Sequence, residues 1–303
     1  MKYGRIPHLN KDISKIVCGT DWLMGCTPSE SFVALDAFVE AGGNCFDTAH
    51  CYGPNSNILG AWLKLRHNAP KLVFLNKGNH PYGSPRFSAE FTRIDILENH
   101  DRLGIDHTDL YVFHRDNPSV PIEEVVDWMN DLIKAGYITA YGGSNWSIER
   151  LAAGNAYAAK TGKQGFSVNN PNLTLAENVK PLWDGCLTID EAGRKWHEES
   201  QLALFSWSSA ARGYFAEIND EHMLASYDSE VSRQRRERAK ELGAKYGLSA
   251  TQIALAWVLN QPFPTFALCG LRKKSDVEEN CKVTELTLTR EEVLYLEKGE
   301  LFK

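Results

Sequence analysis

The chain has 303 residues, of which 43% are hydrophobic and 24% are charged, a balance typical of globular proteins with a sizeable core and unlike that of disordered chains. Its net charge of -6 at pH 7 offers no basic field for nucleic acid or an anionic membrane, so we expect a small-molecule ligand. The first residues lack an apolar run of signal-peptide length and no other run approaches a membrane span, which predicts a cytoplasmic protein.

Eight short apolar runs follow one another along the chain and are typical of buried strands. They span residues 15–19, 44–47, 71–77, 109–114, 138–144, 165–170, 202–208 and 265–270. Segments with helical periodicity lie between them, including 30–42, 93–104, 122–136, 147–160 and 250–261. Gly42, Gly104 and Gly136 stand where three of these helices should end. The alternation predicts parallel strands with crossover helices, and eight such units close a (β/α)8 TIM barrel.

A doubly wound open sheet is the alternative fold. The first strand-to-helix turn, CGTDWLMGC, has no GxGxxG fingerprint, which argues against it. No Pro/Gly/Ser-rich linker divides the chain, so we expect a single domain over residues 1–303. Two connections look long, roughly at 170–191 and 213–230, and long loops on one face of a barrel commonly shape a pocket.

Ionisable residues close three successive predicted strands: Asp47, Lys77 and His114, with Tyr52 on the turn just after Asp47. In (β/α)8 barrels, chemistry lies at the C-terminal ends of the strands. A structural ion pair with a capping histidine is one interpretation, and an acid site is the one we favour. Lys77 would lower the pKa of the Tyr52 phenol, with Asp47 holding Lys77 in place. His114 would orient a substrate oxygen.

His50 and Cys51 lie between Asp47 and Tyr52 and raise two other possibilities. A Cys/His nucleophile pair needs contact between the side chains, which adjacent residues seldom make. A zinc site would require further ligands at strand ends. The chain has seven cysteines, and none of those other than Cys51 is obviously placed to be such a ligand. We therefore expect reduced thiols, no metal site and a spacing role for these two residues.

These motifs resemble the signature of the aldo-keto reductase family. FDTAHCYG at 46–53 is similar to its Asp-Thr-Ala-x-x-Tyr-Gly motif, and the similarity continues through KG at Lys77, DLYVFHRD at His114 and YGGSNWS around Ser144. Weaker similarity follows in FSVNNPN, LFSWSSAARGYF and CGLRKKSDVEEN. The resemblance implies a (β/α)8 barrel that transfers a hydride between NADPH and an aldehyde or ketone, with Tyr52 as the general acid.

The resemblance also implies a cofactor site at the ends of the later strands. Asn145 and Asn170 would hold the nicotinamide carboxamide, Asn170 standing where the family usually has a glutamine, and Phe205 would stack on the ring. The expected cofactor-binding residues are Thr20, Asp21, Ser144, Asn145, Asn170, Phe205, Ser206, Trp207, Ser208, Arg212, Gly270, Arg272, Lys273, Lys274, Glu279 and Asn280.

The cations at 272–274 favour NADPH over NADH, because they precede a helix expected to begin at Ser275, whose spacing to Glu278 is that of a capping box. Asp276 would repel a 2'-phosphate, so NADH is the possible alternative.

Three residues are candidates for substrate binding: Trp22, His80 and Trp146, although either tryptophan could instead belong to the core. His80 and Arg86 make the loop after Lys77 polar, which favours a hydroxylated or anionic carbonyl such as a sugar-derived aldehyde or keto-sugar. The alternative function is a cofactor-sensing binding subunit of a larger assembly with little turnover. The complete set of four residues favours the enzyme, and the sequence leaves its oligomeric state open.

Overall fold

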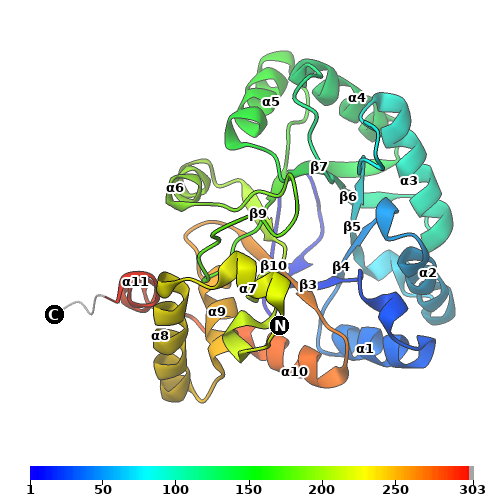
Figure 1. The fold of residues 1–303 in the computed structure, drawn as a ribbon. Coiled ribbons are helices and arrows are strands. Elements are labelled where there is room, and N and C mark those ends of the chain that lie inside the picture. Colours follow the sequence, from blue (N-terminus) through cyan, green and yellow to red (C-terminus); the bar gives the residue numbers. More distant parts are fainter. Residues whose placement is uncertain (300–303) are drawn as a thin grey trace.

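The computed structural model describes residues 1–299 and contains a closed barrel of eight parallel strands (Figure 1). The barrel strands are β3 (Ile16–Gly19), β4 (Cys45–Ala49), β5 (Val73–Gly78), β6 (Thr108–Phe113), β7 (Ile138–Ser144), β8 (Val168–Asn170), β9 (Ala203–Ser206) and β10 (Thr265–Gly270). Strands that follow one another in sequence pair side by side, and β10 closes the barrel against β3. The predicted (β/α)8 barrel and its eight strands are therefore confirmed, with ends shifted by a few residues.

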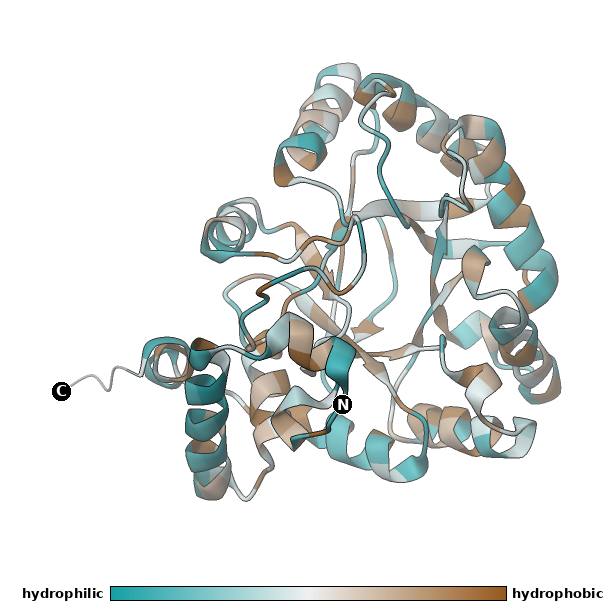
Figure 2. Ribbon diagram, in the orientation of Figure 1, coloured by the Kyte–Doolittle hydropathy of each residue, from teal (hydrophilic) through white to brown (hydrophobic). Residues whose placement is uncertain are grey.

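The helices form a ring outside the barrel, with many hydrophilic residues on their outward sides (Figure 2). They are α1 (Pro28–Glu40), α2 (Pro54–Arg66), α3 (Ala89–Leu103), α4 (Ile122–Lys134), α5 (Ile148–Thr161), α6 (Glu191–Ser200), α7 (Glu221–Tyr227), α8 (Glu230–Tyr246), α9 (Ala250–Leu259), α10 (Lys274–Lys282) and α11 (Arg290–Lys298). Gly42, Gly104 and Gly136 follow three of them with φ of 86°, 69° and 81°, a region that glycine reaches without steric cost.

One helix start differs from the prediction. Helix α10 begins at Lys274 with Lys273 as its N-cap residue, so Ser275 lies inside the first turn and does not cap it. The carboxylate of Asp276 instead reaches back and accepts the backbone N–H of Arg272 at 3.1 Å. A carboxylate in the first turn is stabilised by the positive end of the helix, which explains why the helix needs no serine cap.

A short antiparallel hairpin of β1 (Tyr3–Gly4) and β2 (Ile13–Ser14) closes the N-terminal end of the barrel. Its buried side chains Ile6, Leu9 and Ile13 form one apolar cluster with inward-facing strand residues that include Val17 and Phe266. Because this end is filled with apolar side chains, the opposite, C-terminal end is left for a functional site.

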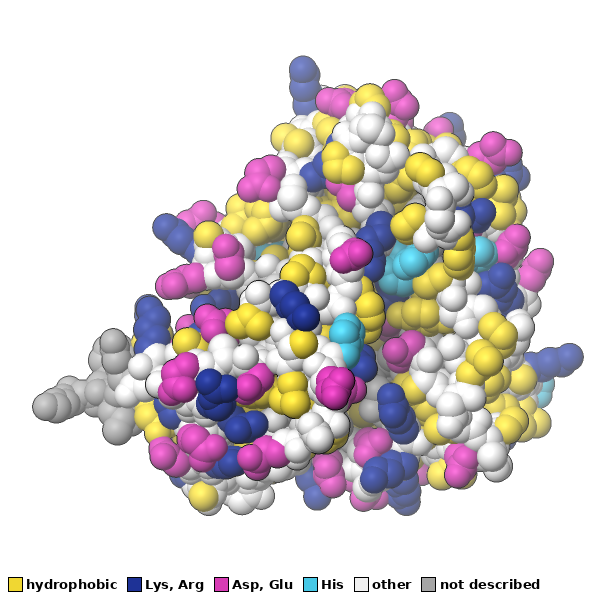
Figure 3. Space-filling model, viewed as in Figure 1, with side chains coloured by type: hydrophobic (Ala, Val, Ile, Leu, Met, Phe, Trp, Pro, Cys, Tyr) yellow, Lys and Arg dark blue, Asp and Glu magenta, His cyan; other side chains and the backbone are white. Residues whose placement is uncertain are grey.

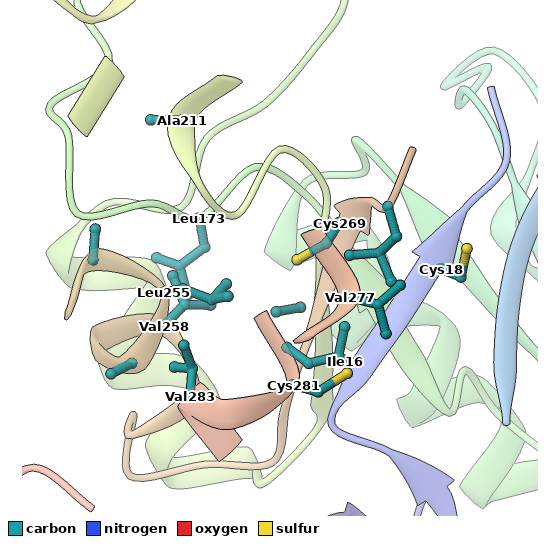
Figure 4. Packing of buried hydrophobic residues seen from close by; sticks show 14 of the residues in the cluster. Ile16, Cys18, Leu173, Ala211, Leu255, Val258, Cys269, Val277, Cys281 and Val283 are labelled. Carbon is teal, nitrogen blue, oxygen red and sulfur yellow. The ribbon is translucent and has the colours of Figure 1, made fainter. Parts of the chain in front are cut away.

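A second apolar layer lies between the outside of the barrel and the helices. Figure 4 shows part of this layer, where Ile16 and Cys18 of β3 and Cys269 of β10 lie near Val277 and Cys281 of α10. These cysteines are free thiols, as predicted, and act as small apolar groups in the core.

Helices α2 and α3 approach each other closely at Gly60. A Cβ atom on this residue would lie 1.9 Å from the backbone oxygen of Arg102, a separation that atoms cannot adopt. Glycine is thus required at this position for the two helices to pack at their observed distance. This packing matters for the site because α2 follows directly from the turn that carries Tyr52.

Two long connections lie over the C-terminal end of the barrel. One joins β8 to α6, and the other joins β9 to α8 and contains α7, which lies in front of the strands in Figure 1. An isolated bridge from Asn172 to Trp207 joins the two segments, and another from Asn172 to Thr188 ties the first connection to itself. In residues 1–299 we find no helix that combines the length and the apolar character needed to span a bilayer.

Candidate active site

Asp47 and Lys77 form a buried ion pair at the ends of β4 and β5. The strand register sets Leu75 beside Asp47 and Ala49 beside Lys77, so Asp47 and Lys77 lie two positions apart on neighbouring strands and face the same side. The Lys77 ammonium donates to Oδ1 and Oδ2 of Asp47 at 2.5 and 2.7 Å, and the residues are 3% and 4% exposed. Burial raises the pKa of Asp47, and the charge of Lys77 opposes that rise.

Tyr52 lies on the single 3-10 turn His50–Tyr52 that joins β4 to α2. Its ring centroid is 5.4 Å from Nζ of Lys77 and 6.1 Å from the ring of His114. Burial raises the pKa of Tyr52 well above its ordinary value, and the carboxylate of Asp47 adds to that rise. The expected lowering of this pKa is thus not found, because desolvation of the phenolate dominates.

His114 follows β6, and its backbone N–H donates to the carbonyl of Gly78 at 2.8 Å. Its ring centroid is 4.8 Å from that of His80. Burial, and then the charge of Lys77, lower the pKa of His114 well below its ordinary value, so the imidazole is neutral at neutral pH. A neutral imidazole can donate one hydrogen bond and accept another, as an orienting group must.

His50 and Cys51 do more than set a distance. Nε2 of His50 lies 2.6 Å from Oε2 of Glu98 on α3, and Arg102 donates to the His50 carbonyl at 2.7 Å, so the turn is tied to that helix. Sγ of Cys51 lies 3.3 Å from Nδ1 of His114. Burial raises the pKa of the Cys51 thiol to about 11, so it is protonated at neutral pH and is not a ready nucleophile.

A polar group of Ser144, Asn145 and Asn170 stands at the ends of β7 and β8. Asn145 has a φ of 60°, and its Oδ1 accepts from the N–H of Leu187 at 3.0 Å and from Nε1 of Trp207 at 3.2 Å. Asn170 donates through Nδ2 to the carbonyl of Phe205, while its Oδ1 is buried and has no hydrogen-bond partner. A buried acceptor without a donor is costly, and an amide NH2 group from a ligand would satisfy it.

Two aromatic residues expected at the pocket lie elsewhere. Phe205 is fully buried and stacks on Phe266 with centroids 4.3 Å apart, so its ring face is already covered. Trp146 is 1% exposed and packs against Phe113 and Phe166, which assigns it to the core. Trp207, two residues further along and just beyond the end of β9, is the partly exposed aromatic residue at this end of the barrel.

Trp207 and Trp22 border different sides of the barrel mouth. Trp207 is partly exposed and lies 5.9 Å from Trp183 of the β8–α6 connection, measured between ring centroids. Trp22 is buried, and its Nε1 donates to the carbonyl of Gly19 at 2.5 Å. Gly270 at the end of β10 is exposed beside Trp22.

The cations expected near a cofactor phosphate surround the first turn of α10. Arg272, Lys273 and Lys274 are exposed, and the nearest carboxylates to the two lysines are at 3.9 Å on Asp276 and 4.0 Å on Glu278. Contacts at these distances between exposed groups are weak, so the ammonium groups are free to take another anion.

The other expected cofactor residues fall into two sets. Buried hydroxyls support the backbone: Thr20 donates to the carbonyl of Asp47, and Ser206 donates to that of Leu173. The remaining ones are exposed or partly exposed, and these are Asp21, Ser208, Arg212, Glu279 and Asn280. Arg212 has a φ of 52° and stacks its guanidinium 5.5 Å from the Trp183 ring centroid.

Arg115 is a further residue of the pocket that the sequence analysis overlooked. It follows His114 directly, and its guanidinium donates to the His114 carbonyl at 2.8 Å and to Sγ of Cys186 at 3.3 Å. Among residues 1–299 no carboxylate lies within ion-pair distance of it. Figure 3 shows histidine and basic side chains beside a hollow near the middle of the visible face. The signal in the sequence was its position next to His114 in DLYVFHRD.

Comparisons with known proteins agree with this geometry. The model of the Aldo/keto reductase family matches residues 15–300. Norsolorinic acid reductase of Aspergillus flavus is 26% identical, with 94% of this chain and 76% of that protein covered. Aldo-keto reductase YhdN of Bacillus subtilis is 26% identical, with coverage of 96% and 91%.

Two further matches come from yeast and from the solved structures. The probable aryl-alcohol dehydrogenase AAD4 of Saccharomyces cerevisiae is 27% identical, with coverage of 88% and 87%. The crystal structure of a thermostable aldo-keto reductase, Tm1743, in complex with the inhibitor epalrestat has a TM-score of 0.75 at 21% identity and covers 98% of this chain and 99% of that one. This last likeness shows a shared fold.

Proposed function

The chain belongs to the aldo-keto reductase family, and we propose that it reduces a polar aldehyde or ketone to the alcohol with NADPH, using Tyr52 as the general acid. The observation that carries the proposal is the convergence of a phenol, a buried ion pair and a neutral imidazole at one end of the barrel, where Nζ of Lys77 is 5.4 Å from the Tyr52 ring centroid. These four groups suffice to orient a carbonyl oxygen and to protonate it.

Each side chain has a distinct part in the proposed reaction. The chemistry that a reduced nicotinamide would supply here, when bound, is a hydride for the carbonyl carbon. His114, neutral because burial lowers its pKa, donates a hydrogen bond to the carbonyl oxygen and fixes its direction. Tyr52 stays protonated over the usual pH range because burial raises its pKa, so it holds the proton that the developing alkoxide needs. Lys77, held by Asp47, stabilises the phenolate that remains.

The residues at the later strands fit a nicotinamide cofactor. The unpartnered Oδ1 of Asn170 suits the amide NH2 of a carboxamide, and Trp207 offers an aromatic wall beside Asn145. We propose NADPH because three exposed cations at 272–274 outnumber the single carboxylate of Asp276 at the start of α10. Asp276 is also engaged by the N–H of Arg272, which reduces its repulsion of a phosphate.

The substrate class is proposed from the polar side of the pocket. Arg115 follows His114 and offers hydrogen-bond donors to hydroxyl or anionic groups of a carbonyl compound, and His80 lies beside His114 and offers an Nε2 lone pair to a hydroxyl group. The relatives named above include a norsolorinic acid reductase and a probable aryl-alcohol dehydrogenase, but identities of 26% and 27% do not carry a substrate across. A sugar-derived aldehyde or keto-sugar matches the donors, and the exposed Trp183 can pack on its ring carbons.

The decisive test is Tyr52→Phe. Turnover of a carbonyl substrate should fall by about 100- to 10,000-fold, the contribution typical of a positioned general acid, while the affinity for NADPH stays unchanged. Tyr157→Phe on α5, away from the site, is the matched control. Undiminished turnover in Tyr52→Phe would refute the acid role, and loss of NADPH binding would indicate a structural role instead.

A second test addresses the cofactor. Asn170→Leu should weaken binding of the nicotinamide nucleotide by about 10-fold or more, because a hydrogen bond to the carboxamide is lost, whereas Asn170→Gln should retain it. Comparison of NADPH with NADH in the same turnover assay tests the phosphate assignment. A strong preference for NADH, unaltered by Lys273→Ala, would overturn it.

A further inference from the structure

Three side chains with metal-ligating atoms converge at the mouth of the pocket: Cys51, His80 and His114. Their ligand atoms, one from each residue, all lie within 4.8 Å of one another. They come from three different barrel connections, namely the turn after β4, the loop after β5 and the end of β6. Sequence spacing gives no sign of this cluster, because its residues are spread over 63 positions of the chain and only the fold of the barrel brings them together.

We propose that Cys51, His80 and His114 form a site for a Zn²⁺-class divalent transition metal, and that the bound metal competes with the carbonyl substrate. Thiolate and imidazole are the ligands that Zn²⁺ prefers, and three protein ligands leave one coordination position for water or a small molecule. The metal-binding part of the proposal is independent of the reaction, and the competition part rests on the proposed function.

The distances suit a tetrahedral ion. With metal–sulfur and metal–nitrogen bonds of about 2.3 and 2.0–2.1 Å, sulfur and nitrogen ligands are separated by about 3.6 Å. Sγ of Cys51 and Nδ1 of His114 are already 3.3 Å apart. His80 has to move in by roughly 1 Å, which its half-exposed position on a loop permits.

Hydrogen bonds fix the tautomer of His80 in the form that a metal needs. Its Nδ1 lies 3.0 Å from the carbonyl of Pro81, which can only accept, so Nδ1 carries the proton. Nε2 is then left with a free lone pair. A backbone carbonyl that holds the second nitrogen of a histidine is the usual outer partner of a metal ligand.

The charge balance predicts moderate affinity. Binding forms a metal–sulfur bond and releases the thiol proton of Cys51 to solvent, so the net charge of the cluster rises by one. The Asp47–Lys77 pair contributes no net charge, while the guanidinium of Arg115 acts electrostatically on Cys51, His80 and His114 and opposes a cation. Arg115→Gln should therefore strengthen metal binding several-fold.

A metal at this position would engage a residue on which the proposed substrate binding depends. It would bind directly to His114, the group proposed to orient the carbonyl, and would sit next to the turn that carries Tyr52. Zn²⁺ should consequently raise the apparent KM for the carbonyl substrate, and a chelator should reverse the effect.

Cobalt binding tests the site without cofactor or substrate. Co²⁺ added to the full, reduced chain should bind with one equivalent per chain and give the thiolate-to-metal absorption and the intense visible bands of a tetrahedral site. Zn²⁺ should displace it. Cys51→Ser should abolish the thiolate band, and His80→Gln should weaken binding by at least the 10- to 100-fold that loss of an outer partner costs. Cys26→Ser, at a half-buried thiol outside the cluster, is the control.

Two results would overturn the proposal. Persistence of the thiolate band in Cys51→Ser, or no band in the unaltered chain, would eliminate the metal site. The fractional loss of activity caused by Zn²⁺ should be measured in the unaltered chain and in Cys51→Ser. An equal loss in both would rule out competition between the bound metal and the substrate. A protein that binds Co²⁺ as described but reduces no carbonyl would support the site and contradict the proposed function, so the two failures are distinguishable.

Discussion

Removing one partner of the Asp47–Lys77 ion pair should destabilise the barrel far more than removing both. Both residues are less than one-twentieth exposed, at 4% and 3%, so Lys77→Met leaves a carboxyl group buried without its counter-charge. Breaking a buried pair in this way costs about 3–5 kcal/mol of unfolding free energy, whereas apolar replacement of the whole pair is often neutral. We therefore expect about 3–5 kcal/mol of loss in Lys77→Met and recovery of most of it in Asp47→Leu/Lys77→Met.

The loss in Lys77→Met should depend on pH in a defined direction. Burial already raises the pKa of Asp47 in the presence of Lys77, and removal of the ammonium raises it further. A carboxyl whose pKa is higher in the folded than in the unfolded chain loses stability as pH rises from the unfolded to the folded value. The penalty should thus be small near the unfolded pKa of about 4 and grow towards neutral pH.

Urea unfolding at several pH values, with turnover measured on the same variants, checks this reasoning. The double variant should regain stability but not activity, because it lacks the ammonium proposed to stabilise the Tyr52 phenolate. A Lys77→Met variant as stable as the unaltered chain at pH 7, or a double variant no more stable than the single one, would refute the counter-charge argument. Full turnover in the double variant would refute the role of Lys77 in the reaction.

Two predictions concern the stability of helices α1–α3. Gly60→Ala should lower the unfolding free energy by about 3 kcal/mol in urea titrations, because its Cβ would meet the Arg102 carbonyl at 1.9 Å, while Gly25→Ala, with no atom within 4 Å, should change it little. Asp36→Ala should cost about 1–3 kcal/mol, since the buried Nε1 of Trp62 loses its acceptor at 2.8 Å, and Asp36→Asn should cost less. Hydrogen bonds from Arg66 lower the pKa of Asp36, so the Asp36 carboxylate stabilises the fold above about pH 4, and this stabilisation is lost as pH falls through the lowered pKa. A difference in unfolding free energy between the unaltered chain and Asp36→Asn that stays constant down to acid pH would contradict this.

The local pattern of the sequence was sufficient for the fold and for placing the candidate catalytic residues at one end of the barrel. Buried strands in a parallel barrel are apolar on both faces, so each appears as a continuous run, and the helices between them keep a 3.6-residue period. Because the strands of a barrel all end at one face, residues that close successive strands must meet there. This rule brought Asp47, Lys77 and His114 together before any coordinates were known, and the pair and the rings are found within contact distance.

Helix starts and electrostatic shifts were less accessible to the sequence. The spacing of Ser275 and Glu278 matched a capping box, yet α10 begins one residue earlier, and Asp276 in its first turn reaches back to the backbone N–H of Arg272. The pKa of Tyr52 was expected to fall and is raised, because desolvation depends on everything that surrounds the phenol and not on one neighbour along the chain.

By itself, the sequence determined the barrel, the order of its elements and which residues stand at the strand ends, because these follow from periodicity and from the geometry of parallel strands. Only the tertiary structure decided which way each side chain points and what it touches. It turned Phe205 into the core against Phe266, and it brought Cys51 against His114 across two strands. Such contacts join residues far apart in the chain, so their distances are set by packing of the whole barrel and leave no trace in local spacing.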